Sequence, residues 1–426
     1  MTTPRGVLEP VTCLGCGCVC DDVSLQVSQG RIVGVAPDCP AARAWFGDGS
    51  VPEKVLRDGT AVGIEDAVAE AASLLAGSAG HVLVYLAPDL STQAQRTALA
   101  LADLLRARVD SATSEPAAAG LLSAQRRGRA SATLGEIRNR ADVLLFWGLD
   151  PVVRYPRYLS RYALEPEGTH VNGGRRGRKV ISVHIGSSRS PAGAELEVTL
   201  DPADEIPALS IMRATVLGNR PGELSPALES AVRAAEEMLR ARYAVLVHEA
   251  EPGALGRDPF RAEGLIALVQ ALNGPTRAAL SSLRAGGNRS GAESVLTWQT
   301  GYPLAVDFSA GFPRYTPAAR GLASIGNGGA TAVLIVGSAG GLEAETSAAL
   351  GRLPTVVIGP RASEAPFAAR VAIDTGVAGI HEAGTAYRMD EVPLPLRPPL
   401  AGRRSAAATL DALLAAVRAR LREKSA

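Results

Sequence analysis

Short apolar runs alternate with longer amphipathic segments from residue 63 to the end of the chain. The runs rich in Val, Ile and Leu predict strands, and the segments with apolar positions three and four residues apart predict helices. Strands are expected at 81–87, 143–147, 180–185, 244–247, 333–336 and 355–358, and helices at 64–76, 91–108 and 406–424. Because strands that are buried on both faces read as continuous apolar runs, the pattern predicts parallel sheets covered by helices.

The amino-terminal segment follows a different pattern. Val23, Leu25 and Val27 alternate with polar neighbours, a turn is expected at 28–30, and an apolar run returns at 31–35, which is typical of a hairpin. A short helix is expected at 41–46. The predicted fold class is therefore α/β, with a small β-rich cysteine domain followed by two Rossmann-like α/β layers.

Four segments are expected along the chain. Residues 1–58 would form the cysteine-rich domain, 59–165 a first α/β region, 166–330 a second, and 331–426 a return to the first layer with a carboxyl-terminal helix. The 426 residues are 46% hydrophobic and 20% charged, enough for several domains.

Charge and hydropathy exclude several classes of partner. The formal net charge is +1, so no global field would attract nucleic acid or an anionic membrane. The amino terminus lacks the apolar core of a secretory signal, and no apolar stretch is long enough to span a bilayer. We therefore expect a cytoplasmic protein with neither nucleic-acid nor membrane partners.

All five cysteines lie within the first 39 residues. Disulfides would be spread along the chain, whereas a tight cluster in a cytosolic protein indicates metal binding. With Cys18 set aside, Cys13, Cys16 and Cys20 form a C-x2-C-x3-C motif, and Cys39 supplies a fourth thiolate after the hairpin. Four thiolates are the ligand set of a [4Fe–4S] cluster, which would carry electrons.

Two alternatives to an iron–sulfur cluster stay open. Structural zinc also takes four cysteines, but usually in two close pairs, and Cys39 stands alone. The motif could equally be a relic that binds nothing. Cys18 fits none of these ligand sets and is interpreted as a free buried thiol.

Other polar motifs give weaker signals. Residues 173–179, GGRRGRK, predict a solvated or subunit-contacting loop in preference to a nucleic-acid site. Residues 337–341 follow a strand and could approach a phosphate, although a simple strand-to-helix turn is favoured. The five histidines lack metal-ligand spacing, and His81, His184 and His248 lie in or beside strands, where a structural role is expected.

The cysteine motif followed by α/β layers resembles the molybdopterin oxidoreductases. Three stretches are similar to the B-type component of formylmethanofuran dehydrogenase, and together they extend the resemblance over nearly the whole chain. They are WGLDPVVRYPRYLSRY (147–162), GAESVLTWQTGYPLAVDFSAGFPRYTP (291–317) and IHEAGTAYRMDEVPL (380–394). The resemblance implies that the terminal β-barrel of the larger oxidoreductases is absent here and forms a separate subunit.

The second of these stretches concentrates aromatic residues among glycines and prolines. The aromatics are Trp298, Tyr302, Phe308, Phe312 and Tyr315. Such a composition prevents a long helix and favours an irregular loop. Exposed aromatics would form a site or an interface, whereas buried ones would fill a corner of the core. Arg314 and Asp307 would serve such a site or form an internal ion pair.

The resemblance also implies a missing ligand. In redox-active members of the family, a cysteine after the second strand–helix unit ligates tungsten or molybdenum, and a histidine follows it. The corresponding region is 109–125, VDSATSEPAAAGLLSAQ, where Pro116 and Ala117 stand in their place. Proline offers no donor atom. Because some relatives use Ser or Asp, the alternative ligands are Ser111, Ser114 and Glu115.

This departure matches the formyltransferase/hydrolase complex of methylotrophic bacteria. There, as the resemblance implies, a formyl group passes from formyl-tetrahydromethanopterin to a methanofuran-type carrier, and an amidohydrolase releases formate. The leading hypothesis is a scaffold that has lost its oxidoreductase activity and its molybdopterin or tungstopterin. Its partners would be an A-type amidohydrolase, a C-type subunit and a D-type formyltransferase.

Two other hypotheses differ in class. The first is an active molybdenum or tungsten formylmethanofuran dehydrogenase subunit, which would interconvert carbon dioxide and formyl groups beside a separate β-barrel subunit. The second is an isolated regulatory or metal-binding protein.

Overall fold

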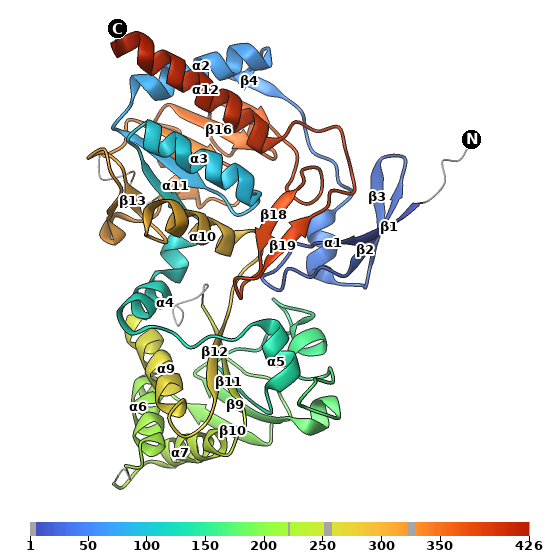
Figure 1. Ribbon diagram of the computed structural model, residues 1–426, viewed down its shortest axis with the longest axis vertical. Coiled ribbons are helices and arrows are strands. Elements are labelled where there is room, and N and C mark those ends of the chain that lie inside the picture. Colours follow the sequence, from blue (N-terminus) through green and yellow to red (C-terminus); the bar gives the residue numbers. More distant parts are fainter. Residues whose placement is uncertain (1–5, 220–221, 251–257, 323–324, 326–328, 426) are drawn as a thin grey trace. The chain divides into compact units, whose positions relative to one another are not determined.

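The computed structural model describes residues 6–219, 222–250, 258–322, 325 and 329–425. The chain divides into two compact units, of which the first comprises Met1–Glu115, Gly286–Arg388 and Pro393–Ala426. The second comprises Pro116–Ala285 and Met389–Val392. The chain thus leaves unit 1, builds unit 2 and returns (Figure 1).

Unit 1 begins with a small antiparallel sheet. Strands β1 (Gly6–Val11), β2 (Val23–Ser28) and β3 (Arg31–Ala36) pair in that order, and helix α1 (Pro40–Phe46) follows. Val23 and Leu25 are buried on one face of β2, which explains their alternation with polar residues. The predicted hairpin and short helix are confirmed.

A nine-stranded sheet forms the body of unit 1 in the described part of the chain, in the order β14-β13-β7-β6-β15-β16-β17-β4-β5. The five strands from β7 to β17 are parallel, and β13 and β4 add to them in the antiparallel sense. The strands are β4 (Val55–Arg57), β5 (Thr60–Ala61), β6 (Val82–Leu86), β7 (Arg108–Ser111), β13 (Val306–Asp307), β14 (Arg314–Tyr315), β15 (Ala332–Val336), β16 (Thr355–Gly359) and β17 (Val371–Asp374).

Helices cover both faces of this sheet. On one face, Val84 and Leu334 pack with α2 (Ile64–Gly77), α3 (Thr92–Leu104), α10 (Arg289–Thr300) and α12 (Ala406–Ser425), and α12 lies along α2 and α3 (Figure 1). On the other, Leu83 and Ile335 pack near α11 (Ala344–Leu350). Alternate residues of each strand therefore enter two separate cores, and the strands read as unbroken apolar runs.

The remaining elements of unit 1 are short. Strands β18 (Gly384–Tyr387) and β19 (Pro393–Leu396) form an antiparallel hairpin, and β18 packs against α3 and α10. Two 3₁₀ turns lie at Pro317–Ala319 and Ala362–Glu364.

Unit 2 contains a five-stranded sheet that is parallel throughout, in the order β10-β9-β8-β11-β12. Its strands are β8 (Val143–Trp147), β9 (Lys179–Ile185), β10 (Leu196–Leu200), β11 (Ala244–Glu249) and β12 (Ala278–Leu283). Its helices are α5 (Leu134–Arg140), α6 (Glu205–Val216), α7 (Pro226–Leu239) and α9 (Pro259–Leu272), with a π turn at Leu159–Ala163 and 3₁₀ turns at Gly174–Gly177 and Pro202–Asp204. Helix α4 (Ser114–Arg127) spans the boundary between the two units.

A buried ion pair fixes helices α6 and α9 of unit 2 to the end of β8. Arg261 Nε lies 2.7 Å from Glu205 Oε1, and their side chains are 3% and 5% exposed. The indole of Trp147 donates a 2.6 Å hydrogen bond to the same carboxylate. A charge that is removed from water is stable only when it is paired and hydrogen-bonded, so the burial of each of these three side chains depends on the other two.

The structure confirms a mixed α/β fold and most of the predicted elements. The predicted helix 91–108 was too long, because α3 ends at Leu104 and Arg106 takes a left-handed φ of 49° before β7 begins. The predicted four-segment division stays a prediction. In the described part of the chain, none of the helices has the length and apolar character needed to cross a bilayer.

The buried ion pair generates a stability prediction. Replacing Arg261 by Ala leaves the Glu205 carboxylate buried without its cation, and this should lower the free energy of unfolding by about 3–5 kcal/mol. Urea unfolding followed by tryptophan fluorescence, to which the buried Trp147 contributes, measures it. The exposed Arg213→Ala variant is the control, expected to change stability by about 0.5 kcal/mol or less. An Arg261→Ala effect as small as the control's would contradict the assigned role.

Candidate functional site

The cysteine loop lies between β1 and β2. Cys13, Cys16, Cys18 and Cys20 are all buried, and Cys39 is buried at the start of α1. The backbone N–H of Cys13 donates to the Cys20 carbonyl at 2.9 Å, so the loop closes on itself. The backbone N–H of Gly15 donates to Cys13 Sγ at 3.3 Å. One tight loop thus presents several sulfur atoms.

The four predicted ligands are electrostatic neighbours. Burial raises the pKa of the Cys13 thiol, the hydrogen bond from Gly15 opposes that shift, and nearby Cys16, Cys20 and Cys39 raise the pKa further. The structure therefore brings together the residues that the spacing had grouped. A hydrogen bond with Cys16 and then burial raise the pKa of Cys18, whereas Arg388 lowers it. Cys18 is thus a buried thiol that is hydrogen-bonded to Cys16 and lies beside the predicted ligands.

Backbone packing leaves no room for side chains beside this loop. A Cβ on Gly15 would lie 2.3 Å from the Ala41 carbonyl oxygen, and one on Gly286 would lie 2.6 Å from the carbonyl oxygens of Leu14 and Gly15. The N–H of Gly287 donates to the Leu14 carbonyl at 2.7 Å. The segment by which the chain returns to unit 1 is therefore packed directly on the cysteine loop.

Asn288 extends this packing to two further elements. Its amide nitrogen donates to the Leu90 carbonyl and to the Thr92 hydroxyl, both at 3.1 Å, and its amide oxygen accepts the Tyr387 N–H at 2.7 Å. The side chain is fully buried. Sequence reasoning missed Asn288 and also the strand β12 that precedes it, and the only local signal was a polar residue after two glycines.

The cysteine loop and the start of α1 carry thiols, the donor type that an iron–sulfur cluster takes. In the described residues, no three His, Cys, Asp or Glu side chains are placed to hold a single metal ion. A cubane cluster is larger than one ion, and its four sulfur ligands stand correspondingly further apart. Four buried thiols on one loop and one helix start match that set.

The region where the resemblance implies a missing metal ligand is the end of β7 and the start of α4. Pro116 and Ala117 lie in the first turn of α4. Of the alternative donors, the Ser111 hydroxyl shares a 2.8 Å hydrogen bond with the Thr113 hydroxyl. Glu115 pairs with Arg320 at 2.8 Å. These residues do not fit a thiolate-ligated molybdenum or tungsten.

A buried carboxylate closes the same sheet edge. Asp110 accepts backbone N–H groups from Ser111 at 2.9 Å, from Ala305 at 3.2 Å and from Gly321. Burial raises the pKa of Asp110, and these backbone hydrogen bonds lower it. Asp110 therefore ties β7 to the segment after α10, a role that its sequence context did not indicate.

The aromatic stretch divides between core and surface. Helix α10 runs to Thr300 and ends at Gly301, whose φ is 85°, and the predicted irregular loop begins only there. Phe308 is buried, and Tyr302 stacks on Tyr315 with centroids 5.0 Å apart. These three aromatics fill the core corner that was one of the two interpretations.

Two other aromatics of this stretch reach solvent. Trp298 is 57% exposed and packs edge-on against Tyr387, and Phe312 is 59% exposed. Arg314 lies 3.5 Å from Asp307, so the internal ion pair is confirmed.

The glycine turn after β15 is closed by an acidic side chain. The N–H of Ser338 donates to Asp89 Oδ1 at 3.0 Å, and burial raises the pKa of Asp89. Gly337 has a φ of 101°, and a Cβ there would lie 2.5 Å from the same carboxylate. A carboxylate at this position repels phosphate, so the simple strand-to-helix turn is the better interpretation.

The arginine-rich loop is partly structural. Arg178 is buried and donates to the carbonyls of Pro166 at 2.9 Å and Gly174 at 3.0 Å, which corrects the expectation of a wholly solvated loop. Arg175 pairs with Glu195 at 2.9 Å. These arginines satisfy backbone and carboxylate groups of their own unit.

Polar side chains gather at the end of β11. His248 is buried, its Nδ1 lies 3.1 Å from the Glu249 carbonyl oxygen, and its Nε2 lies 2.8 Å from the Ser282 hydroxyl. Since a carbonyl only accepts, Nδ1 carries the proton and Nε2 accepts from Ser282. Burial, together with the charges of Arg261 and Arg129, holds the pKa of His248 well below its usual range. The structural role expected of this histidine fits that geometry.

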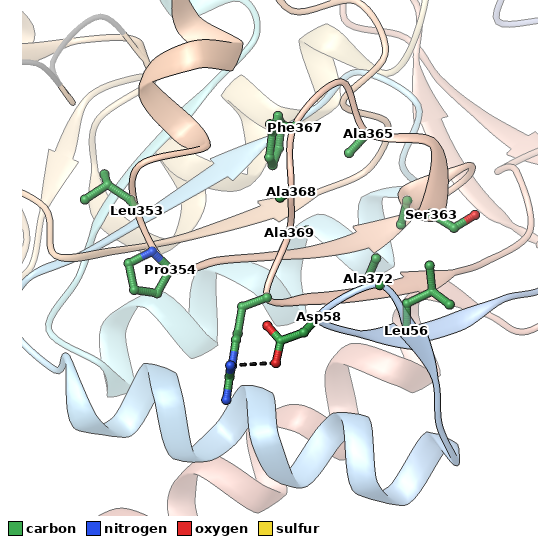
Figure 2. A pocket seen from close by; sticks show the side chains of 13 residues that line it. Leu56, Asp58, Leu353, Pro354, Ser363, Ala365, Phe367, Ala368, Ala369 and Ala372 are labelled. Atoms are coloured by element: carbon green, nitrogen blue, oxygen red, sulfur yellow. Dashed lines mark hydrogen bonds and ion pairs between the residues drawn. The ribbon is translucent and has the colours of Figure 1, made fainter.

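A hollow of about 420 Å³ lies at the amino ends of β16 and β17. Figure 2 shows that leucine, proline, alanine and phenylalanine side chains line most of it, with Asp58 as its acidic member. The cation at its edge, Arg370, pairs with Asp58 at 2.6 Å and with Glu70 at 2.8 Å. It lies at the edge opposite the strand ends that carry Asp110 and Asp89, so we do not assign the chemistry to it.

Several known proteins are similar to this chain. The B-type component of tungsten-containing formylmethanofuran dehydrogenase 2 from Methanocaldococcus jannaschii is 32% identical over 410 residues, which cover 92% of this chain and 93% of that relative. The protein of the same name from Methanococcus maripaludis is 31% identical over 407 residues, with the same coverage. The B-type component of the formyltransferase/hydrolase complex Fhc from Methylorubrum extorquens is 29% identical over 261 residues, 61% of this chain and 66% of that relative.

A solved structure is also similar. The X-ray crystal structure of the formyltransferase/hydrolase complex from Methylorubrum extorquens with methylofuran contains a chain that matches with a TM-score of 0.69 and 26% identity. The match covers 87% of this chain and 99% of that chain. No family model matches the sequence.

The buried His248 generates a pH prediction. The pKa of His248 is lowered in the folded state, so on acidification the unfolded chain binds a proton at this residue before the folded chain does. The free energy of unfolding therefore decreases as pH falls below about 6.5. His248 should contribute about 1.4 kcal/mol per pH unit to that loss. Urea unfolding between pH 7 and 5 measures the slope. A His248→Gln variant should lose this contribution, whereas the exposed His81→Gln control should keep it; equal slopes for all three proteins would refute the assignment.

Proposed function

Because the chain belongs to the family of B-type formylmethanofuran dehydrogenase components, as its motifs predicted, we propose that it is the scaffold of a formyl-group-transferring and hydrolysing complex. In this proposal the complex moves a formyl group from formyl-tetrahydromethanopterin to a methanofuran-type carrier and releases formate. The chain itself carries no oxidoreductase activity. The complex works in the cytoplasm.

The observation that carries the proposal is the donor set at the start of α4. The resemblance to redox-active members places their cysteine and histidine at Pro116 and Ala117, and no cysteine follows Cys39. Ser111 and Glu115 are already bonded to Thr113 and Arg320. A molybdenum or tungsten centre on Ser111 or Glu115 would have to break these contacts. The third alternative, the Ser114 hydroxyl, is buried without a hydrogen-bond partner in the described residues, but a hydroxyl is a weaker ligand than a thiolate.

We assign the chain's partners from the relative with a known assembly. The matching chain comes from a formyltransferase/hydrolase complex, which supports a B-type component that binds other subunits. The proposed partners are an A-type amidohydrolase, a C-type subunit and a D-type formyltransferase. A metal-dependent amidohydrolase performs its chemistry without a redox centre, so the loss at α4 is compatible with an active complex.

We further propose that Cys13, Cys16, Cys20 and Cys39 hold a [4Fe–4S] cluster. The burial of all four thiols supports this assignment, because burial disfavours free thiolates and metal binding removes that cost. A bound cluster supplies electron transfer or, where no electrons flow, folding energy for the small sheet. Cys18 stays outside the ligand set and donates to the Cys16 sulfur.

A second candidate function is an active tungsten or molybdenum dehydrogenase subunit. The tungsten-containing relatives favour it, because they align with a larger share of this chain than the Fhc relative does. The donor set at α4 opposes it, and we regard that chemistry as the stronger argument.

Metal content separates the two functions. We expect the anaerobically purified native complex to contain about four iron atoms per B-type chain and no stoichiometric molybdenum or tungsten, because only the cysteine loop offers thiolates. Inductively coupled plasma mass spectrometry measures all three elements. Stoichiometric tungsten or molybdenum would overturn the scaffold function, and the absence of iron would leave a scaffold with relic cysteines.

Matched cysteine variants test the ligand set within the same measurement. Cys13→Ser should remove most of the iron, because it removes one of four thiolates, whereas Cys18→Ser should retain it. Equal iron loss in both variants would contradict the assignment of Cys18 outside the set. Zinc in place of iron would select the structural alternative.

A further inference from the structure

Three arginines gather at the amino edge of the sheet in unit 2. Arg140 ends α5 just before β8, Arg242 lies just before β11, and Arg277 directly precedes β12. Because β8, β11 and β12 are parallel neighbours, the residues that precede them meet at one edge of the sheet. His170 and Tyr243 complete the lining there.

The hollow at this edge has a volume of about 650 Å³ and is open to solvent, since Arg140, His170, Arg242 and Arg277 are all exposed. It is lined by these residues with Glu136 and Tyr243. It lies at the opposite edge from the end of β11, where His248 is found, so it is separate from the sheet end at which open α/β folds bind ligands.

The acidic groups nearby are already engaged. Glu136 Oε2 accepts the backbone N–H of Thr133 at 2.9 Å and its hydroxyl at 3.1 Å, which caps α5. Asp142 accepts Arg242 Nε at 3.0 Å and the backbone N–H of Tyr243 at 2.9 Å. The hydrogen bonds described here for these two carboxylates go to Thr133, Arg242 and Tyr243, and not to Arg140 or Arg277.

Arg140 and Arg277 keep their charges available. Within the described part of the chain, no side-chain hydrogen bond or ion pair joins either guanidinium to another residue. Burial and the Glu136 charge raise the pKa of Tyr243, and the charges of Arg140 and Arg277 oppose that rise. Because the pKa is raised on balance, the phenol stays protonated and can donate a hydrogen bond. The hollow thus offers two guanidinium groups and a phenol, all of them donors.

The frame that holds these donors is rigid. The N–H of Ala244 donates to the Arg277 carbonyl at 2.8 Å, and the Arg242 guanidinium donates to the His170 carbonyl at 3.2 Å. Asn273 bonds the carbonyl of Ala278 at 2.8 Å. Three separate backbone segments are therefore fixed around one opening before a partner binds.

We propose that this hollow binds an acidic segment of another subunit of the same complex, with Asp or Glu side chains on Arg140 and Arg277. The proposal rests on the proposed function, in which this chain docks other subunits. Charge complementarity selects the occupant, because three guanidinium groups face two engaged carboxylates. The open shape favours a polypeptide over a small ion, since small ligands are mostly enclosed, and Arg and Tyr are typical anchors of protein interfaces.

Zero-length cross-linking tests the contact in the intact complex. Arg140→Lys and Arg277→Lys keep the charge and introduce amines that a carbodiimide joins only to carboxylates in direct contact. We expect mass spectrometry of the cross-linked native complex to identify amide links from Lys at these positions to Asp or Glu of another subunit. The exposed Arg213→Lys, which lies outside the hollow, is the matched control and should form no such link.

The neighbouring Glu136 serves as an internal reference. Links to Glu136 alone, in a complex that is otherwise intact, would show that the reagent reaches the hollow and finds no partner, and would overturn the inference while leaving the proposed function standing. A wild-type chain that purifies without other subunits would overturn both.

Charge reversal provides a second readout. The Arg140→Glu/Arg277→Glu variant should reduce the amount of one co-purifying subunit at least tenfold at about 150 mM salt, roughly the loss of one pair of charge-assisted contacts, with Arg213→Glu unchanged. Thermal unfolding of the variant checks that it folds. If inorganic phosphate raises the melting temperature of the wild-type complex but not of the variant, and subunit content is unchanged, the hollow binds a free anion and the inference is wrong.

Discussion

The contact between the returning chain and the cysteine loop is the constraint on which unit 1 depends. Gly286 and Gly287 lie so close to the carbonyls of Leu14 and Pro88 that any larger residue would collide with backbone. The buried side-chain amide of Asn288 then hydrogen-bonds the Leu90 carbonyl, the Thr92 hydroxyl and the Tyr387 N–H. Three short segments that are far apart in sequence are thus held by a single tripeptide.

Within unit 1, the cysteine loop and the carboxyl edge of the large sheet differ in how their polar groups are bonded. The sulfur loop retains four buried thiols, whereas the carboxyl edge of the large sheet is occupied by internal hydrogen bonds. Asp110 binds three backbone amides there, and Asp89 binds the turn after β15. Most polar groups described at this edge are bonded within the chain, and the buried Ser114 hydroxyl is an exception. This internal bonding supports the scaffold function that we propose.

The sequence analysis predicted the elements that are encoded by residues close together in the chain. Strand β8 was predicted at its observed bounds because five consecutive apolar residues favour a buried strand. The cysteine spacing grouped residues that are electrostatic neighbours in the fold. Sequence reasoning could not reach Asn288, Asp110 or the Glu205–Arg261 pair, because their partners lie far along the chain and no spacing rule connects them. The end of α3 was misplaced because apolar residues continue past Leu104, and the left-handed turn at Arg106 has no glycine to announce it.

The order of strands in the large sheet sets the order in which the protein can fold during synthesis. Strand β6 pairs with β7 nearby in sequence but also with β15, which the ribosome delivers only after the whole of residues 116–285. Unit 2 is nearly continuous and can therefore complete its parallel sheet first. Until β15 arrives, the nascent chain exposes an apolar strand edge that is prone to pair with other chains, so the yield of this protein should depend on chaperones that shield β6 while unit 2 is being made.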